Sequence, residues 1–333
     1  MAFGQRSGTP TSVDSTEIFG FNQFVTGVRG WTGTDVVLTG SSVSGGATVA
    51  MIYVGPIAPT DDAGIYLLPP TFAGQDVTTS TFYGPDTFLF NPSLGKGNVR
   101  AVGSYQYSGS SACNHGMLYD GPPAGGGSWT QIDVPSSAVG GAAVWNTIPH
   151  STMGDLVVGD YDLEDEPLSA NAFVYDLVRD RWTIFDFAGC SLTTAYGIWQ
   201  SGPGSQSYTI VGGTRDGRGI NRGFVVGYDR ASGAFSNLKL YSAMNHPGLL
   251  THFEGITAAP GGFHLAGMTA TCALVAAIEV NPDGAFSDAA WTAFNYPGSA
   301  LTTGNTVYQD TLMGVFAVSG TQGVQSYAAT FSA

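Results

Sequence analysis

A phrase that recurs with variations constrains the fold of this chain more than any other feature. The clear copies read VRAVGSYQYSGSSACNHGMLYDG from Val99, DLVVGDYDLEDEPLSANAFVYDL from Asp155 and YTIVGGTRDGRGINRGFVVGYDR from Tyr208. Each has a hydrophobic strand that ends near Val-Gly, a polar hairpin, and a second strand that closes on Tyr-Asp. Weaker copies begin at Val36, Phe263 and Gly314. Repeats of this size that contain only strands and turns are typical of a β-propeller.

The six copies predict a six-bladed β-propeller of four-stranded blades, forming a single domain over 1–333. The expected blades are 13–70, 71–135, 136–190, 191–250, 251–298 and 299–333. The last copy supplies only three strands, so we expect residues 1–12 to close the ring, which removes open edge strands. The composition agrees with an all-β fold, because glycine is abundant (48 residues) and no stretch has the 3.6-residue period of an amphipathic helix.

The charge of the chain argues against two classes of partner. Its formal net charge is −14, and it lacks the basic stripe that binding to nucleic acid or to an anionic membrane surface requires. No run approaches the roughly 18 apolar residues of a membrane span. Cys113, Cys190 and Cys272 lie far apart, which is not typical of a disulfide framework or a metal-binding CxxC pair, so we expect small buried side chains.

The phrases GSYQYSGSSACNHGMLYDG and GGTRDGRGINRGFVVGYD resemble bacterial HAF-type extracellular repeats. Those repeats combine a turn, a Val-Gly strand end and a strand with His or Arg before Gly or Ala and Phe. The resemblance implies a propeller and favours a secreted or cell-surface location over the cytoplasm. It carries no catalytic motif and transfers no functional residue. His115 alone reproduces the His, while Arg222 and Asn171 replace it in other copies.

Two aligned columns on the expected inner strands contain the candidate chemistry. The first column is Phe19, Tyr83, Trp145, Tyr196, Glu254 and Gly304, and the second, two residues earlier, is Glu17, Thr81, Ala143, Thr194, His252 and Thr302. Residues two apart in a strand share a face. Glu254 interrupts the aromatic column, and His252 and Glu17 interrupt the column of small residues.

These three polar residues have two interpretations. A carboxylate in an apolar site has a raised pKa, which suits acid–base catalysis. Two carboxylates and an imidazole would also suit one divalent metal ion. Alternatively, Glu254, His252 and Glu17 face a water-filled channel and only hydrate it.

The aromatic residues also have two interpretations. Phe19, Tyr83, Trp145 and Tyr196 either pack between blades or form a stacking surface for a sugar or planar ligand. His246, in the connection 241–255, is either a surface histidine or lies over the channel mouth beside His252. We assign no role to His150 or His264.

The acidic stretch from Asp160 to Glu166 resembles the start of a calcium loop. It lacks Gly at the sixth position and an acid at the twelfth, so a solvated acidic hairpin is the better interpretation.

The sequence therefore favours an enzyme of hydrolase or lyase type that acts on a small polar molecule or sugar in the axial channel. Glu254 would be the acid or base, with His252 and Glu17 as partners or metal ligands. The polar residues are unique to particular blades, which indicates one asymmetric site. A glycan- or ligand-binding propeller and a protein-interaction scaffold are the alternatives, and the sequence indicates no oligomeric state.

Overall fold

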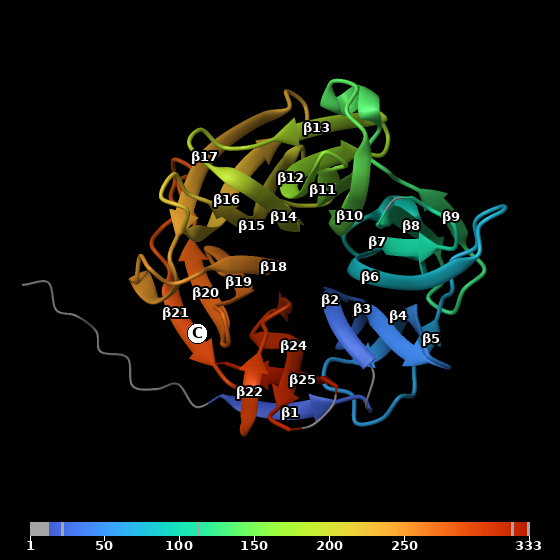
Figure 1. The fold of residues 1–333 in the computed structure, drawn as a ribbon. Coiled ribbons are helices and arrows are strands. Elements are labelled where there is room, and N and C mark those ends of the chain that lie inside the picture. The colour runs from blue at the N-terminus through green and yellow to red at the C-terminus, as the bar shows by residue number, and fades with distance from the viewer. Residues whose placement is uncertain (1–12, 21–22, 112, 321–322, 332–333) are drawn as a thin grey trace, which may run out of the picture.

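The computed structural model describes residues 13–20, 23–111, 113–320 and 323–331, and these form a ring of six antiparallel sheets (Figure 1). The protein is a six-bladed β-propeller, as the repeat predicted. The helical segments of the described ranges are the short 3₁₀ turns η1 (Pro92–Leu94), η2 (Ser136–Val139) and η3 (Ala243–Asn245). Over the same ranges, no helix has the length and apolar character needed to cross a membrane.

The first five blades each contain four strands in chain order from the axis outward. Blade 1 contains β2 (Gln23–Gly30), β3 (Asp35–Ser44), β4 (Ala47–Pro56) and β5 (Ile65–Leu67). Blade 2 contains β6 (Val77–Thr87), β7 (Val99–Tyr107), β8 (His115–Gly121) and β9 (Ser128–Gln131). Blade 3 contains β10 (Val144–Met153), β11 (Leu156–Leu163), β12 (Glu166–Asp176) and β13 (Arg181–Phe185). Blade 4 contains β14 (Ser191–Gln200), β15 (Ser207–Arg215), β16 (Asn221–Asp229) and β17 (Ala234–Tyr241). Blade 5 contains β18 (His252–Ala259), β19 (Gly262–Met268), β20 (Ala273–Glu279) and β21 (Ala290–Phe294).

Blade 6 joins the two ends of the chain. Its strands are β22 (Ser299–Thr302), β23 (Thr306–Tyr308), β24 (Thr311–Val318), β25 (Gln325–Thr330) and β1 (Asp14–Ile18). The antiparallel pairing of β1 with β25 confirms closure by an N-terminal strand. The predicted position was wrong, because the closing strand is Asp14–Ile18, whereas residues 1–12 lie outside the described residues. The first inner strand consequently begins at Gln23, later than the alignment on Gly20 assumed.

The glycine of the repeated phrase has a steric origin. It lies on the second strand of each blade, opposite an irregularity in the inner strand. A Cβ atom at Gly212, for example, would overlap the carbonyl oxygen of Thr194. The same conflict with an inner-strand carbonyl oxygen occurs throughout the column of Gly40, Gly103, Gly159, Gly212, Gly267 and Gly314. Only glycine permits this close approach, and this explains why the phrase is repeated.

The hydrophobic core lies between neighbouring sheets. The largest cluster joins blades 3, 4 and 5, with Val158, Ile210, Phe224 and Phe253 fully buried. Alternate residues of each strand face opposite sides of the sheet, so each blade contributes to the interface on both sides.

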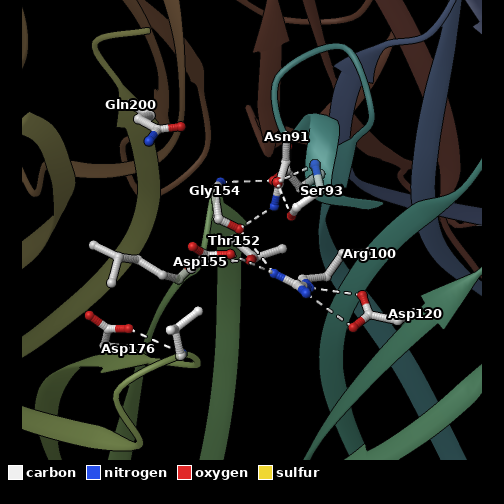
Figure 2. A network of polar contacts seen from close by, with 12 residues as sticks. Asn91, Ser93, Arg100, Asp120, Thr152, Gly154, Asp155, Asp176 and Gln200 are labelled. Atoms are coloured by element: carbon white, nitrogen blue, oxygen red, sulfur yellow. Dashed lines mark hydrogen bonds and ion pairs between the residues drawn. The ribbon is translucent and has the colours of Figure 1, made fainter. Parts of the chain in front are cut away.

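A polar network at the β10–β11 hairpin joins blades 2 and 3 (Figure 2). The Gly154 amide donates to Oδ2 of Asp86 (2.8 Å), and the Gly154 carbonyl accepts from Nδ2 of Asn91 (2.6 Å) and Nη1 of Arg100 (3.0 Å). Arg100 also donates through Nε and Nη2 to the two oxygens of Asp120, at 2.8 and 3.1 Å. The end of the inner strand of blade 3 is therefore fixed against blade 2.

The same hairpin is fixed to blade 4 through Arg230. Its guanidinium donates to both oxygens of Asp176, at 2.7 and 2.8 Å, and to Oδ2 of Asp155 at 3.1 Å. Burial is the largest single influence and would raise the pKa of Asp176, but the hydrogen bonds and charge of Arg230, together with the Arg179 and Val178 amides, outweigh it and lower this pKa below its usual value.

Candidate active site on the propeller axis

The inner strands of blades 1 to 5 each contain a β-bulge, and the extra residue of each bulge lines one axial cavity. The pairing with the second strand skips Thr26, Tyr83, His150, Tyr196 and Glu254 in blades 1 to 5, and blades 2, 3 and 4 have a further register shift nearer the start of the inner strand. All of them line an axial cavity of about 170 Å³, together with Arg29 and Asn305. A bulge redirects a side chain that regular pleating would aim elsewhere. The backbone therefore presents a different side chain from each of these blades to one point.

This column corrects the sequence alignment at two blades. Tyr83, Tyr196 and Glu254 occupy the positions that the alignment gave them. Phe19 does not: it follows β1, is buried, and packs edge-to-face on Tyr53 with a centroid distance of 5.1 Å. Trp145 lies near the start of β10, at a separate register shift five residues before His150, and does not line the axial cavity. The sequence does not locate the inner position in these two blades, because the number of residues between the bulge and the repeat glycine differs from blade to blade.

The predicted trio of Glu17, His252 and Glu254 does not assemble. Glu17 lies on β1, the outermost strand of blade 6, where it is exposed and accepts a hydrogen bond from Gln325. The prediction that Glu17 joins the axial site, and with it the three-residue metal site, is wrong because Glu17 was assigned to an inner strand. Among the residues that the structure describes, no three His, Cys, Asp or Glu side chains gather as a metal site would need.

His252 and Glu254 do lie together at the start of β18. Nδ1 of His252 is 4.0 Å from Oε1 of Glu254, and Nε2 of His252 is 3.1 Å from the Thr194 hydroxyl. Their side chains are 18% and 20% exposed. Burial, with a smaller contribution from Asp160, raises the pKa of Glu254 to about 8. Burial, followed by the charge of His150, lowers the pKa of His252 to about 4. At neutral pH the site therefore contains a protonated carboxylic acid beside a neutral imidazole.

Aromatic rings from successive blades continue the wall of the cavity. The Tyr196 ring lies between His150 and His252, with centroid distances of 3.9 and 4.5 Å, and Tyr83 is 5.0 Å from His150. Burial raises the pKa of both tyrosines, so both phenols remain hydrogen-bond donors at neutral pH.

His150 is one of the site residues that the sequence analysis missed. Its Nε2 lies 2.7 Å from Oδ1 of Asp160 on β11. Asp160 and Asp162 are 6% and 4% exposed, so the prediction of a solvated acidic hairpin is wrong for these two residues. The short turn at Gly154 between β10 and β11 places His150 next to the residue that pairs with the repeat glycine, Gly159. Counting back from Gly159 across this turn would therefore have identified His150 from the sequence.

Arg29 lies further along β2 and reaches across the axis. Nη2 donates to the Ile198 carbonyl in blade 4 at 3.0 Å, Nη1 donates to the Val28 carbonyl at 2.9 Å, and the guanidinium lies over the Trp199 ring at 5.4 Å. Arg29 is only 4% exposed, and its Nε has no hydrogen-bond partner among the described atoms. Burial lowers the pKa of Arg29 to about 10, which leaves it charged. Arg29 thus adds a cationic group to the cavity that Glu254 lines, whereas His252 contacts Glu254 and Tyr196 but is not among the lining residues.

His246 does not line the axial cavity. It is exposed at the end of η3, and its Nδ1 accepts a hydrogen bond from the Gly248 amide at 3.4 Å. The structure therefore brings together His252, Glu254, Tyr83 and Tyr196 from the predicted site, adds His150 and Arg29, and leaves out Glu17, Phe19, Trp145 and His246.

The fold and cavity define a six-bladed propeller with one asymmetric polar site on its axis. No protein-family model and no curated protein matches the sequence. A mutant Trypanosoma rangeli sialidase with trans-sialidase activity has a similar structure, with a TM-score of 0.51 and 8% identity over 97% of this chain and 60% of that chain. The chain thus spans less than two thirds of that enzyme.

Two further solved structures are similar at lower scores. The Dos1 propeller has a TM-score of 0.44 and 8% identity, covering 95% of this chain and 93% of that one. The catalytic domain of the Coprinopsis cinerea GH62 alpha-L-arabinofuranosidase has a TM-score of 0.42 and 9% identity, covering 97% and 98%. Identities this low establish similarity of fold alone.

Proposed function

We propose that this protein is an enzyme of hydrolase or lyase type that acts on a small polar molecule or sugar bound in the axial cavity. The observation that carries the proposal is the pair of His252 and Glu254, 4.0 Å apart, with pKa values displaced in opposite directions. Two neighbouring titratable groups whose environments displace their pKa values in this way are suited to serve as general base and general acid. The similarity to the sialidase fold does not indicate which reaction this protein catalyses, because one propeller fold supports many functions.

In this mechanism Glu254 is the general acid. Its carboxyl is protonated at neutral pH and lines the cavity, so it is placed to protonate the leaving oxygen of a bound substrate. His252 is neutral at the same pH and is held by Thr194 beside Glu254, behind the residues that line the cavity, so it would accept a proton through an intervening water.

The remaining wall residues would bind and orient the substrate. The Tyr83 and Tyr196 phenols offer donors beside apolar rings, which is the combination that sugar binding uses. Arg29 lines the cavity and places its positive charge near a bound acceptor oxygen, although its Nε is itself buried. These contacts would fix the substrate between the guanidinium and the acid–base pair.

The test is a binding screen followed by a turnover assay. The probes are free monosaccharides, uronic acids and small hydroxy acids, with binding measured by ligand-observed NMR and turnover by mass spectrometry. We expect Glu254→Gln to bind the same probe and to lose at least about 100-fold in turnover, the usual contribution of a positioned acid. Glu279→Gln, at an exposed residue of β20, is the matched control and should retain full turnover. Equal turnover in wild type and Glu254→Gln would overturn the assignment.

A non-catalytic ligand-binding propeller is the second candidate, favoured by the aromatic rings of Tyr83 and Tyr196 on the cavity wall. Binding of a probe that the wild-type protein leaves chemically unchanged would support it. If no probe binds, both candidates fail and the interaction scaffold becomes the leading function.

A further inference from the structure

A second cluster of reactive side chains lies outside the axial cavity, at the β7–β8 hairpin and the segment after β9. Oγ of Ser110 is 2.7 Å from Nε2 of His115, and Nδ1 of His115 is 2.7 Å from Oδ2 of Asp133. Hydroxyl, imidazole and carboxylate follow one another through the two ring nitrogens in the order of a Ser-His-Asp triad. Such triads occur on unrelated folds and are recognised by geometry rather than by sequence order.

The carboxylate and the imidazole are both held in place. Asp133 accepts hydrogen bonds from the Gly116 amide (2.7 Å) and from Nε2 of Gln131 (2.6 Å), in addition to its contact with His115. The His115 ring stacks on Tyr107 at 4.9 Å and is itself only 11% exposed. An orienting carboxylate and a fixed ring are what a serine nucleophile needs from its base.

The imidazole and carboxylate of the triad border a separate cavity of about 230 Å³ between blades 2 and 3, and Ser110 adjoins it through its contact with His115. His115 and Asp133 line it, together with Asn114, Val134, Ser136, Val144, Trp145, Asn146 and Thr147. Backbone hydrogen bonds from Cys113 to the Trp145 carbonyl (2.8 Å) and from Thr147 to the Asn114 carbonyl (3.1 Å) hold the two blades together here. The wall offers an indole and aliphatic groups beside the imidazole, and the volume suits a small acyl group.

The imidazole is not a structural requirement of the repeat. The strand register places Asn171 and Asp186 of blade 3, and Arg222 and Ser242 of blade 4, at the positions of His115 and Asp133. In blade 4 the arginine contacts the serine directly, so this position can be filled without a base. Among these three blades, blade 2 alone combines a hydroxyl, an imidazole and a carboxylate.

We propose that Ser110, His115 and Asp133 form a second, esterolytic site that accepts carboxylic esters with a small acyl group. The Ser110 oxygen attacks the ester carbonyl carbon while its proton passes to Nε2 of His115. The carbon–oxygen bond to the alcohol then breaks, and the alcohol leaves with that proton. Water attacks the acyl-serine, with His115 again as base, and releases the carboxylic acid and free Ser110.

The test uses the full chain with two probes, a fluorophosphonate that labels activated serines and p-nitrophenyl acetate. We expect the fluorophosphonate on Ser110 by peptide mass spectrometry, and loss of both labelling and hydrolysis in Ser110→Ala. Ser108→Ala is the matched control, because Ser108 is exposed in the same hairpin and bonds Asp76 instead. It should react as the wild type does. His115→Gln should slow hydrolysis at least about 100-fold, as removal of a triad base does.

The result is independent of the axial site, because Glu254→Gln should leave labelling of Ser110 unchanged. Three outcomes would overturn the proposal: no labelling of the wild-type protein, labelling of a different residue, or equal hydrolysis by wild type and Ser110→Ala. Since Ser110 lies in a hairpin, its alanine variant should fold normally, which circular dichroism would verify even if His115→Gln is unstable.

Discussion

The guanidinium of Arg29 in blade 1 donates a hydrogen bond to the carbonyl oxygen of Ile198 in blade 4, on the opposite side of the ring. Arg29 and Ile198 lie 169 residues apart in sequence, and the Arg29 side chain spans the propeller axis to connect their strands. Arg29 therefore has two roles. It ties opposite blades together, and it places a charged donor in the cavity that also contains Glu254.

Replacing Arg29 should destabilise the ring. Arg29→Met removes charge-assisted hydrogen bonds to the Val28 and Ile198 carbonyls, and we expect a loss of about 2–4 kcal/mol in the free energy of unfolding. Urea unfolding of the wild type and of Arg29→Met measures this difference in the free energy of unfolding. Arg218→Met is the control, because the side chain of Arg218 is 73% exposed and its loss should cost less than about 0.5 kcal/mol. Equal stability of the two variants would show that the cross-axis contact contributes nothing.

The pKa of Glu254 makes the stability depend on pH. The carboxyl ionises at 4.5 in the reference state and at about 8 in the fold, so the folded state holds an extra proton between these values. Stability from this group is therefore lost as pH rises from about 4.5 to about 8. Glu254→Gln cannot ionise, and at about 1.4 kcal/mol per pKa unit the variant should gain a few kcal/mol on the wild type between pH 4.5 and pH 9. Urea unfolding of the wild type, Glu254→Gln and the control Glu279→Gln at both pH values tests this. If the free energy of unfolding of the wild type and of Glu254→Gln changed equally with pH, Glu254 would not be a buried acid with a raised pKa.

The imidazole of His252 should titrate near pH 4. Its pKa is lowered from 6.5 by burial first and by the charge of His150 second. Nitrogen-15 NMR of the ring should thus report a neutral imidazole at pH 6, and His150→Gln should move the midpoint upward. A midpoint near 6.5 in the wild-type protein would mean that the ring is solvated, and His252 would then lose its role as a base that is neutral throughout the working range.

The low pKa of His252 also affects stability, in the opposite direction to Glu254. The unfolded chain binds a proton at about pH 6.5 and the folded chain only at about pH 4, so stability from this group is lost as pH falls between these values. The two effects cancel between about pH 4.5 and 6.5, so the stability from this pair should be greatest there and fall as pH rises towards 8 or drops towards 4.

The repeat glycine should not tolerate a methyl group. Gly212→Ala would force Cβ against the Thr194 carbonyl oxygen and displace the inner strand that bears Tyr196, at a cost of about 1–3 kcal/mol. Gly217→Ala is the control, because Gly217 lies in the exposed turn after β15 and its nearest atom to an added Cβ is 3.3 Å away. Thermal unfolding measures the stability of the two variants. If Gly212→Ala were as stable as Gly217→Ala, steric conflict would not explain why glycine recurs at this position.

The junction between blades 3 and 4 should depend on Arg230. Arg230→Met leaves the Asp176 carboxylate buried without its guanidinium, which typically costs about 3–5 kcal/mol. Lys239→Met is the control, because its partner Asp288 is 95% exposed and such pairs contribute about 0–1 kcal/mol. The difference should narrow in acid, since protonation of Asp176 removes its need for a cation; a difference independent of pH would contradict the ion-pair explanation.

The repeated phrase by itself determined the architecture. The strands, the hairpin and the Tyr-Asp pair that ends each copy follow from local sequence. The six copies determined the number of blades, and the three strands of the last copy predicted closure by an N-terminal strand. Every blade has the same steric requirement for glycine at this position, so the recurrence of the glycine can be seen in the sequence alone.

The site was only partly accessible from sequence. His252 and Glu254 lie two residues apart on one strand, so local spacing sufficed to place them together. His150, Arg29 and the Ser110–His115–Asp133 cluster were not found, because turn lengths differ between blades and contacts between strands far apart in sequence have no local signal. Tertiary structure alone decided which residue each bulge presents to the axis, and it placed Glu17 on an outer strand because ring closure uses the N-terminal strand at the rim.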